Sequence, residues 1–188
     1  MISLWCDTET TGLEPIDSGP FEIAFLVYHD AQLLEERIFH LNPLNDEVVI
    51  HQGAMDVNGA TEELIRSYPP AREVVPEIAG FFKKHCPPEK LVLAGYNCPF
   101  DRGHLAGLLF REGFLMEDYF QERSIDVLDL VKRAKGIGII DPKGDNKLTT
   151  MTKALGIPHE GAHGAMADIK AARWLYEAIY SKYKEKRT

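Results

Sequence analysis

Long apolar segments are missing from this chain, although 45% of its 188 residues are apolar. No run of residues is long and uncharged enough to predict a transmembrane helix. The start of the sequence, MISLWCDTET, also lacks the basic stretch and the apolar segment of a secretory signal. We therefore expect a cytoplasmic protein with no membrane partner. The length and the apolar fraction suffice for one sizeable core, so we predict a single domain over residues 1–188.

Cysteine and net positive charge are also scarce. The three cysteines, Cys6, Cys86 and Cys98, show no paired spacing typical of a metal site, and an odd number forms no closed disulfide framework. We interpret them as reduced thiols in a reducing compartment. The formal charge of −8 argues against a protein that coats long duplexes, because that mode needs a broad basic surface. A small site in which bound cations supply the positive charge is compatible with it.

The hydrophobic pattern predicts an α/β fold. Three short apolar runs, at residues 2–7, 21–28 and 33–40, are typical of strands in an antiparallel meander. The first run is apolar at almost every position, as in a central strand covered on both faces. Two further strands, LVLAG and SIDV, are expected to alternate with helices, which implies a mixed sheet flanked by helices. Helices are predicted from Thr61, over 71–84, over 104–113, over LDLVKRAKG and from Ala165, with a surface loop over 136–147.

The first candidate functional pair lies at the end of the first strand. Asp7 and Glu9 are two residues apart in DTETTGL, so an extended chain points both carboxylates to the same side. Two acids on one face of a central strand are costly without a counter-charge. The alternative is that both are simply solvated. Gly12 favours the functional interpretation, because a glycine lets the backbone turn sharply and offer N–H groups to a ligand.

Two further acids stand at element ends. Asp101, in YNCPFD, follows the strand LVLAG and is a candidate metal ligand, although Asp101 or Asn97 could instead cap the next helix. Asp168, in AHGAMAD, falls in the first turns of the last helix, where the helix dipole alone would favour an acid. Its neighbours Ala165 and Ile169 belong to the inward stripe, however, and an inward acid needs a partner. His163 lies beside the turn that starts this helix and could be structural.

In combination, these residues resemble the DEDDh group of DnaQ-like 3′→5′ exonucleases. That family includes the proofreading subunit of bacterial DNA polymerase III, oligoribonuclease and RNase T. The resemblance runs from Asp7 in DTETTG through Asp101 in NCPFD to His163 and Asp168 in HGAMAD, with weaker stretches such as FEIAFLV, IDVLDL and LTTMTKALGI between them. It implies a ribonuclease H-like fold and a divalent-metal-dependent exonuclease that releases nucleoside 5′-monophosphates.

The family implies that two Mg²⁺ or Mn²⁺ ions are held by Asp7, Glu9, Asp101 and Asp168. These ions prefer carboxylate oxygens, and two of them can stabilise both the attacking and the leaving oxygen of a phosphodiester. The sequence has no Cys/His cluster of the kind that zinc prefers. The position of His163, five residues before Asp168, matches the general base of the family, a role that suits an imidazole at neutral pH.

The resemblance also implies where a nucleic acid with a free, single-stranded 3′ end would bind. Glu9 and the backbone of Thr10, Thr11 and Gly12 are expected to hold the terminal 3′ hydroxyl, while Leu13 and Phe100 pack against the last bases. Stacking of this kind tolerates any base. The same groove is expected to include Asn97, His51, Met55 and Asn58, although many relatives carry a histidine where this chain has Asn58.

Two other functions stay open from the sequence. The chain could be an oligoribonuclease-like enzyme that trims RNA, because no residue of the groove reveals whether a 2′ hydroxyl is read. It could also be a proofreading or interaction module that docks to a polymerase or repair complex. A phosphatase with an aspartyl nucleophile would also begin with a strand-end acid, but it does not explain Glu9, His163 and Asp168 together.

Overall fold

A computed structural model describes residues 1–141, 143–161 and 164–186. Its centre is a five-stranded mixed sheet in the order β3-β2-β1-β4-β5. The strands are β1 (Ile2–Thr10), β2 (Pro20–His29), β3 (Gln32–His40), β4 (Leu91–Gly95) and β5 (Phe120–Asp126). The first three form the expected antiparallel meander, whereas β4 and β5 run parallel to β1. The predicted mixed sheet, with the first strand at its centre, is confirmed.

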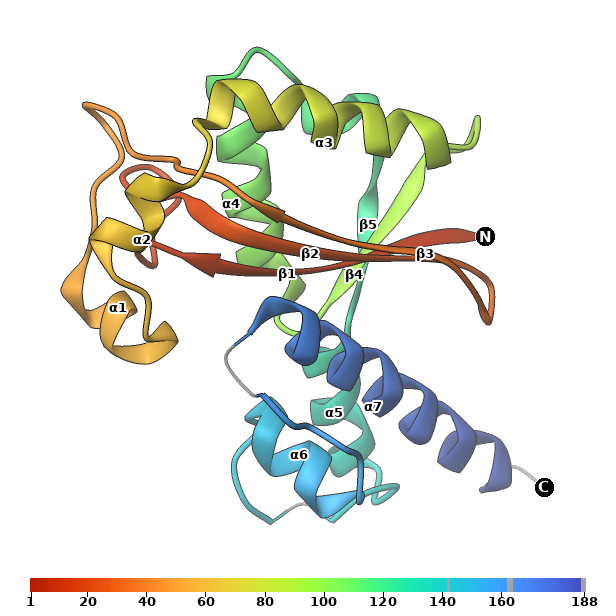
Figure 1. Cartoon of the computed structure of the whole chain (residues 1–188). Helices are drawn as coiled ribbons and strands as arrows, with labels where there is room; N and C mark the ends of the chain where they lie inside the picture. The colour runs from red at the N-terminus through yellow and green to blue at the C-terminus, as the bar shows by residue number, and fades with distance from the viewer. Residues whose placement is uncertain (142, 162–163, 187–188) are drawn as a thin grey trace.

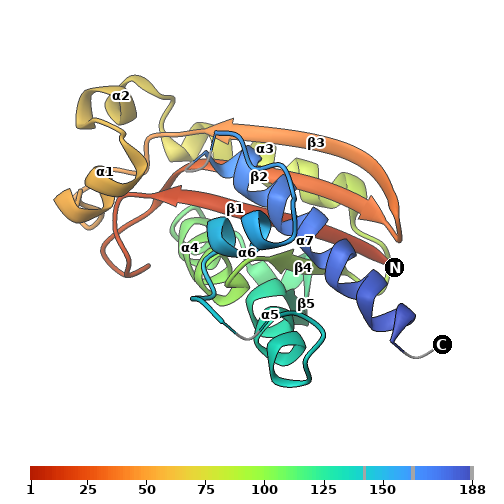
Figure 2. The same ribbon diagram turned by 90° about the horizontal axis from the view of Figure 1, so that it is seen from below.

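Helices cover both faces of this sheet (Figure 1). One face carries α3 (Ala71–His85) and α4 (Cys98–Arg111), and the other carries α5 (Val127–Gly136), α6 (Leu148–Ala154) and α7 (Ala165–Glu185). Two short helices, α1 (Gln52–Asn58) and α2 (Glu62–Ser67), lie beyond the end of β1, and a 3₁₀ turn, η1 (Met116–Asp118), precedes β5. Seen from below, α7 runs diagonally across the sheet (Figure 2). None of the helices in the described part of the chain is long and apolar enough to cross a membrane.

The alternation of side chains along β1 divides the core in two. Leu4 and Cys6 are buried with α3 and α4, while Trp5 is buried on the opposite face with α5 and α7. Both faces of β1 are therefore packed, as the nearly continuous apolar run predicted. Asp7 and Glu9 continue the series of Trp5, so the strand directs them toward the face covered by α7.

The helix predictions differ from the structure in three places. Helix α4 begins at Cys98 rather than at residue 104, because Pro99 occupies its first turn, where a missing N–H costs nothing. Helix α1 was not predicted; it has one buried residue, Met55, so it leaves no helical periodicity in the sequence. Helix α6 was not predicted either, since LTTMTKA is short and rich in β-branched threonine. Strand β5 begins at Phe120 and so extends beyond the predicted SIDV.

Candidate active site

Asp7 and Glu9 lie in β1 near its carboxyl end, where both side chains are partly exposed. Asp7 is paired in register with Ala24 of β2, and Glu9 is paired with Glu22. The ladder is irregular after Glu9, which lets the chain leave the sheet toward the Gly12 turn. The two carboxylates therefore stand side by side on the edge of the sheet where the parallel strands β1, β4 and β5 all end.

Asp101 reaches the same edge from the first turn of α4. Its carboxylate is buried, with 3% of the residue exposed, and its Oδ1 accepts a hydrogen bond from Thr8 Oγ1 at 2.8 Å. The last residue of β4, Gly95, must be a glycine for β4 to lie this close to β1, because a Cβ atom there would lie 2.8 Å from the Cys6 carbonyl oxygen. Asn97 then turns the chain with a positive φ of 61°, which an asparagine tolerates better than most residues do.

Asp168 comes from the first turn of α7, on the other side of the sheet edge. Its Oδ1 accepts a hydrogen bond from His159 Nε2 at 2.6 Å, and the His159 side chain is only 6% exposed. Thr152 Oγ1 lies 3.4 Å from the other ring nitrogen of His159. The predicted general base, His163, lies outside the described residues.

The charges of these acids act on one another. Burial, followed by the charges of Asp101, Asp168 and Glu9, raises the pKa of Asp7 well above its ordinary value. Burial and the charges of Asp168 and Glu22 raise the pKa of Glu9 from 4.5 to about 8. Every charge acting on these two groups has the same sign, so the site destabilises its own ionised form.

Asp101 belongs to the same electrostatic cluster. Burial raises its pKa from 3.8 to about 7, although the hydrogen bond from Thr8 opposes the shift. A divalent cation is the simplest counter-charge for such a group of carboxylates, and carboxylate oxygen is the donor that Mg²⁺ and Mn²⁺ prefer. The donor set therefore fits such ions. Within the described residues, however, no three Asp, Glu, His or Cys side chains are arranged so that together they could hold a metal ion.

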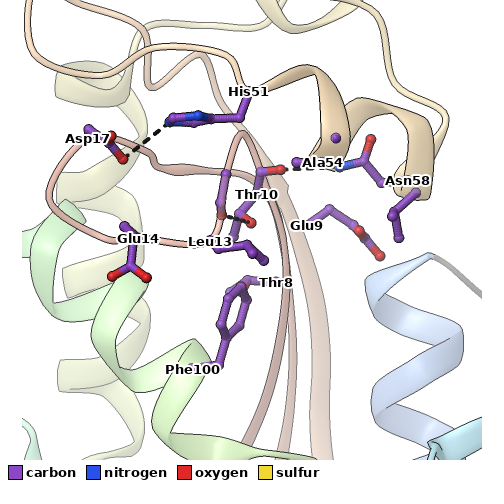
Figure 3. A pocket seen from close by; sticks show the side chains of 13 residues that line it. Thr8, Glu9, Thr10, Leu13, Glu14, Asp17, His51, Ala54, Asn58 and Phe100 are labelled. Atoms are coloured by element: carbon purple, nitrogen blue, oxygen red, sulfur yellow. Dashed lines mark hydrogen bonds and ion pairs between the residues drawn. The ribbon is translucent and has the colours of Figure 1, made fainter.

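A cavity of about 630 Å³ opens beside Glu9 (Figure 3). Leu13 and Phe100 both line it, and the Glu9 side chain points toward the start of α7. Most of the lining is apolar side chain or backbone. The lining residues are Thr8, Glu9, Thr10, Gly12, Leu13, Glu14, Asp17, His51, Gly53, Ala54, Val57, Asn58 and Phe100.

The structure thus brings six of the nine expected substrate-binding residues to this cavity: Thr10, Gly12, Leu13, Phe100, His51 and Asn58. Asn58 does so by donating a hydrogen bond to the Thr10 carbonyl oxygen at 3.1 Å, and His51 Nε2 lies 3.3 Å from Asp17 Oδ1. The other three lie elsewhere. Thr11 is fully buried, Met55 is buried against Phe21 and Ile65, and Asn97 is exposed at the start of α4. A role of any of these residues in binding substrate stays a prediction.

Glu22 was missed by the sequence reasoning, although it is the one acid in the apolar strand PFEIAFLVYH. Its Oε1 accepts a hydrogen bond from the Ala165 N–H at 3.0 Å, and its Oε2 lies 3.0 Å from His40 Nε2. Glu22 therefore caps the first turn of α7, the turn that carries Asp168, from the sheet. Its position as an acid inside an apolar strand could have identified Glu22 as a candidate from the sequence. His159 and Thr8, which contact Asp168 and Asp101, left no signal of that kind.

Comparison with known proteins identifies the family. A family model of the RNase T type, described as an exonuclease, matches residues 4–176. This chain belongs to that exonuclease family. It also aligns with a DNA polymerase III of the PolC type from Clostridium perfringens at 26% identity, over 95% of this chain and 11% of the polymerase. The PolC-type polymerase of Thermotoga petrophila is 28% identical over 50% of this chain and 6% of its own length.

Solved structures share the fold of this exonuclease domain. A structure of exonuclease I superimposes with a TM-score of 0.79 at 23% identity, covering 96% of this chain and 41% of that chain. Escherichia coli exonuclease I in complex with a dT13 oligonucleotide gives a TM-score of 0.78 at 24% identity, over 99% of this chain and 42% of that chain. The ribonuclease H-like fold expected from the sequence is thereby confirmed. The chain spans about a tenth or less of the polymerases and about two fifths of exonuclease I.

Proposed function

We propose that this chain is a divalent-metal-dependent 3′→5′ exonuclease that removes nucleoside 5′-monophosphates from single-stranded DNA. The observation that carries the proposal is the meeting of four acids from three elements, Asp7, Glu9, Asp101 and Asp168: the charges of Asp101 and Asp168 act on both Asp7 and Glu9, and Glu9 lines the cavity. Like charges gathered in this way are unfavourable without a counter-ion, so their arrangement serves binding rather than folding.

In this proposal the four carboxylates hold two Mg²⁺ or Mn²⁺ ions, which supply charge stabilisation at the attacking and leaving oxygens of a phosphodiester. Asp101 is held for this task by Thr8, and Asp168 by the turn that Glu22 caps. His163 takes the proton of the attacking water, as the resemblance to the DEDDh group implies. An imidazole is suited to this step because its ordinary pKa lies near neutrality.

The terminal nucleotide of the substrate binds in the cavity next to these acids. Its base lies between Leu13 and Phe100, and Glu9 with the backbone of Thr10 to Gly12 receives the 3′ hydroxyl. Such apolar contact does not discriminate between bases, so sequence specificity should be low. Structures of exonuclease I, which shares this fold, in complex with dT13 and dA16 oligonucleotides support DNA as the proposed substrate.

The test uses matched 20-nucleotide DNA and RNA strands with a 5′ fluorophore, in Mg²⁺, in Mn²⁺ and in EDTA. The proposal predicts a ladder that shortens by one nucleotide at a time on DNA, absent in EDTA and blocked by a 3′ phosphate. Faster degradation of RNA would favour the RNA-trimming alternative instead. Internal cleavage, or equal degradation of the 3′-blocked strand, would refute a 3′→5′ exonuclease.

A matched pair of variants assigns the activity to the site. Asp168→Asn should abolish the ladder, whereas Asp129→Asn, an exposed acid on α5 paired with Lys132, should leave it unchanged. Equal activity of Asp168→Asn and the wild type would remove Asp168 from the metal site.

A second role, association with a polymerase, is favoured by the alignment with PolC-type polymerases. Gel filtration of the purified chain with a bacterial replicative polymerase tests it. Co-elution would support a proofreading module, and separate elution with full exonuclease activity would support an enzyme that acts alone.

A further inference from the structure

The two apolar walls of the cavity belong to different segments. Leu13 lies in the loop that follows β1, residues 12–18, whereas Phe100 lies in the first turn of α4. The Leu13 side chain is 74% exposed, so its own packing does not fix its position. The gap between the walls must therefore be set by whatever joins the loop to the helix.

His104 makes that connection from inside the protein. The residue is 1% exposed and lies one helical turn after Phe100. Its Nδ1 is 3.2 Å from the Phe100 carbonyl oxygen, and its ring lies against the Phe100 ring with centroids 4.4 Å apart. On its other side, Nε2 is 3.2 Å from Ser18 Oγ, and Ser18 Oγ donates a hydrogen bond to the Glu14 carbonyl oxygen at 2.6 Å.

The rest of the loop rests on the same face of α4. A Cβ atom at Gly103 would lie 3.1 Å from Pro15 Cγ, and one at Gly107 would lie 3.3 Å from the Pro15 carbonyl oxygen. Arg111 donates to the carbonyl oxygens of Pro15 and Ile16. Because these contacts do not involve His104, the loop keeps its anchor at Pro15 when the imidazole is changed. Phe100 and Ser18, by contrast, are joined through His104.

We propose that His104 is a positioning residue that holds the Leu13 loop at a fixed distance from Phe100, and that this distance sets the affinity for the 3′-terminal nucleotide. The proposal rests on the binding of that nucleotide between Leu13 and Phe100. The base inserts between two walls that are held apart before it arrives, so no binding energy goes into ordering them. His104 touches neither substrate nor metal in this scheme and acts through Phe100 and Ser18.

The test compares His104→Phe, which keeps a ring beside Phe100 but loses the polar contacts of the imidazole with Phe100, Ser18 and the Gly12 backbone, with Ser18→Ala, which removes only the Ser18 contact. KM and kcat are measured on a 5′-labelled single-stranded DNA. Each change should raise KM about 3- to 10-fold, as expected for one hydrogen bond, and leave kcat within about twofold. The double variant should be no worse than His104→Phe, because both changes break one connection. His104→Gln, which retains an N–H group, should restore KM to within about twofold.

A second readout follows binding without turnover. In the Asp168→Asn background, a DNA with 2-aminopurine as its 3′-terminal base should show the same 3- to 10-fold loss of affinity in a fluorescence titration, with a loss for Ser18→Ala no larger than the loss for His104→Phe.

His85→Phe is the matched control. His85 is a histidine with 10% of its side chain exposed, and its ring also lies against a phenylalanine, with the centroids of His85 and Phe81 5.0 Å apart. Its Nε2 lies 2.8 Å from Glu35 Oε2, and it is not among the residues that line the cavity. The His85→Phe substitution should lower the melting temperature without changing KM. The inference is overturned if Ser18→Ala and His104→Phe also lower only the melting temperature. A wild type that fails to shorten DNA from its 3′ end would instead defeat the proposed function, so the two failures are distinct.

Discussion

The two sides of the candidate site are built in opposite ways. On the apolar side, the Leu13 loop is fixed to α4 by His104, Arg111 and close contacts at two glycines. On the charged side, burial raises the pKa of Asp7, Glu9 and Asp101, the charges of Asp101 and Asp168 raise the pKa of Asp7 and Glu9 further, and Asp168 is held by His159. The apolar wall is complete without a ligand. The acidic side is strained without one, since like charges share a region from which water is partly removed.

This difference predicts two kinds of mutant. Changes on the acidic side should remove catalysis and spare or improve the stability of the metal-free protein, because they relieve repulsion. Changes on the apolar side should weaken substrate binding and leave the chemical step nearly intact. We therefore expect substitutions on the Glu9 side of the cavity to lower activity without lowering stability, and substitutions on the Leu13 side to weaken substrate binding.

The largest effect is expected for Asp7→Asn. The amide cannot replace a carboxylate as a ligand of a hard cation, so activity should fall at least as far as the roughly 10²–10³-fold typical of losing one transition-state contact. In EDTA at pH 8, the same variant should melt at a higher temperature than the wild type. Calorimetry and the ladder assay check both halves; retention of activity, or a lower melting temperature, would contradict the account of Asp7.

On the other side of the site, Phe100→Ala should raise KM by about 5- to 100-fold, the range expected for one lost base–aromatic contact. Its effect on kcat should be small. Phe110→Ala is the matched control, because Phe110 lies on the same helix with 73% of its surface exposed and lines no part of the cavity. Equal KM values for both variants would show that the base does not bind against Phe100.

Between the two sides lies Glu22, which caps α7. Glu22→Gln can keep one hydrogen bond to Ala165 or lose it, but it removes the charge at the helix start, so a cost of about 0.5–1 kcal/mol is expected. For a chain of this size that amounts to roughly 1–4 °C in melting temperature. Activity should fall by a few-fold because Asp168 is less well placed. A variant that loses all activity at unchanged stability would instead make Glu22 a ligand.

The last prediction concerns the pH dependence of stability and requires no substitution. A carboxyl group whose folded-state pKa is raised contributes stability that is complete below its unfolded pKa and is lost as the pH rises through its folded pKa. For Asp101 and Glu9, with folded values of about 7 and about 8, the loss falls between about pH 4 and pH 9. In EDTA the melting temperature should therefore decline over this window, and Mn²⁺ should flatten the decline. A melting temperature that rises toward pH 9 in EDTA would contradict the raised pKa values of Asp101 and Glu9.

Much of this architecture could be predicted from the pattern of residues. The apolar run of β1, followed by two acids two residues apart, predicted both a central strand and the direction of Asp7 and Glu9. Helix α7 was visible from its inward stripe. Helix α1 was not, because a single buried residue, Met55, gives no periodicity.

The parts of the site that sequence reasoning missed depend on contacts between distant segments. Glu22 and Ala165 are 143 residues apart, and Ser18 and His104 are 86 apart. Nothing in the local sequence of either partner specifies the other. The contact of His159 with Asp168 is closer in sequence, but it depends on the turn between them, which periodicity does not describe.

The central claim is that the four acids converge to hold divalent cations beside the nucleotide cavity. Its most direct test is a crystal grown with Mn²⁺ and a nucleoside 5′-monophosphate, in which the anomalous signal of manganese is measured. The account predicts manganese peaks bounded by carboxylate oxygens of Asp7, Glu9, Asp101 and Asp168, with the base against Phe100. No manganese peak among these residues, at a concentration that supports activity, would contradict it.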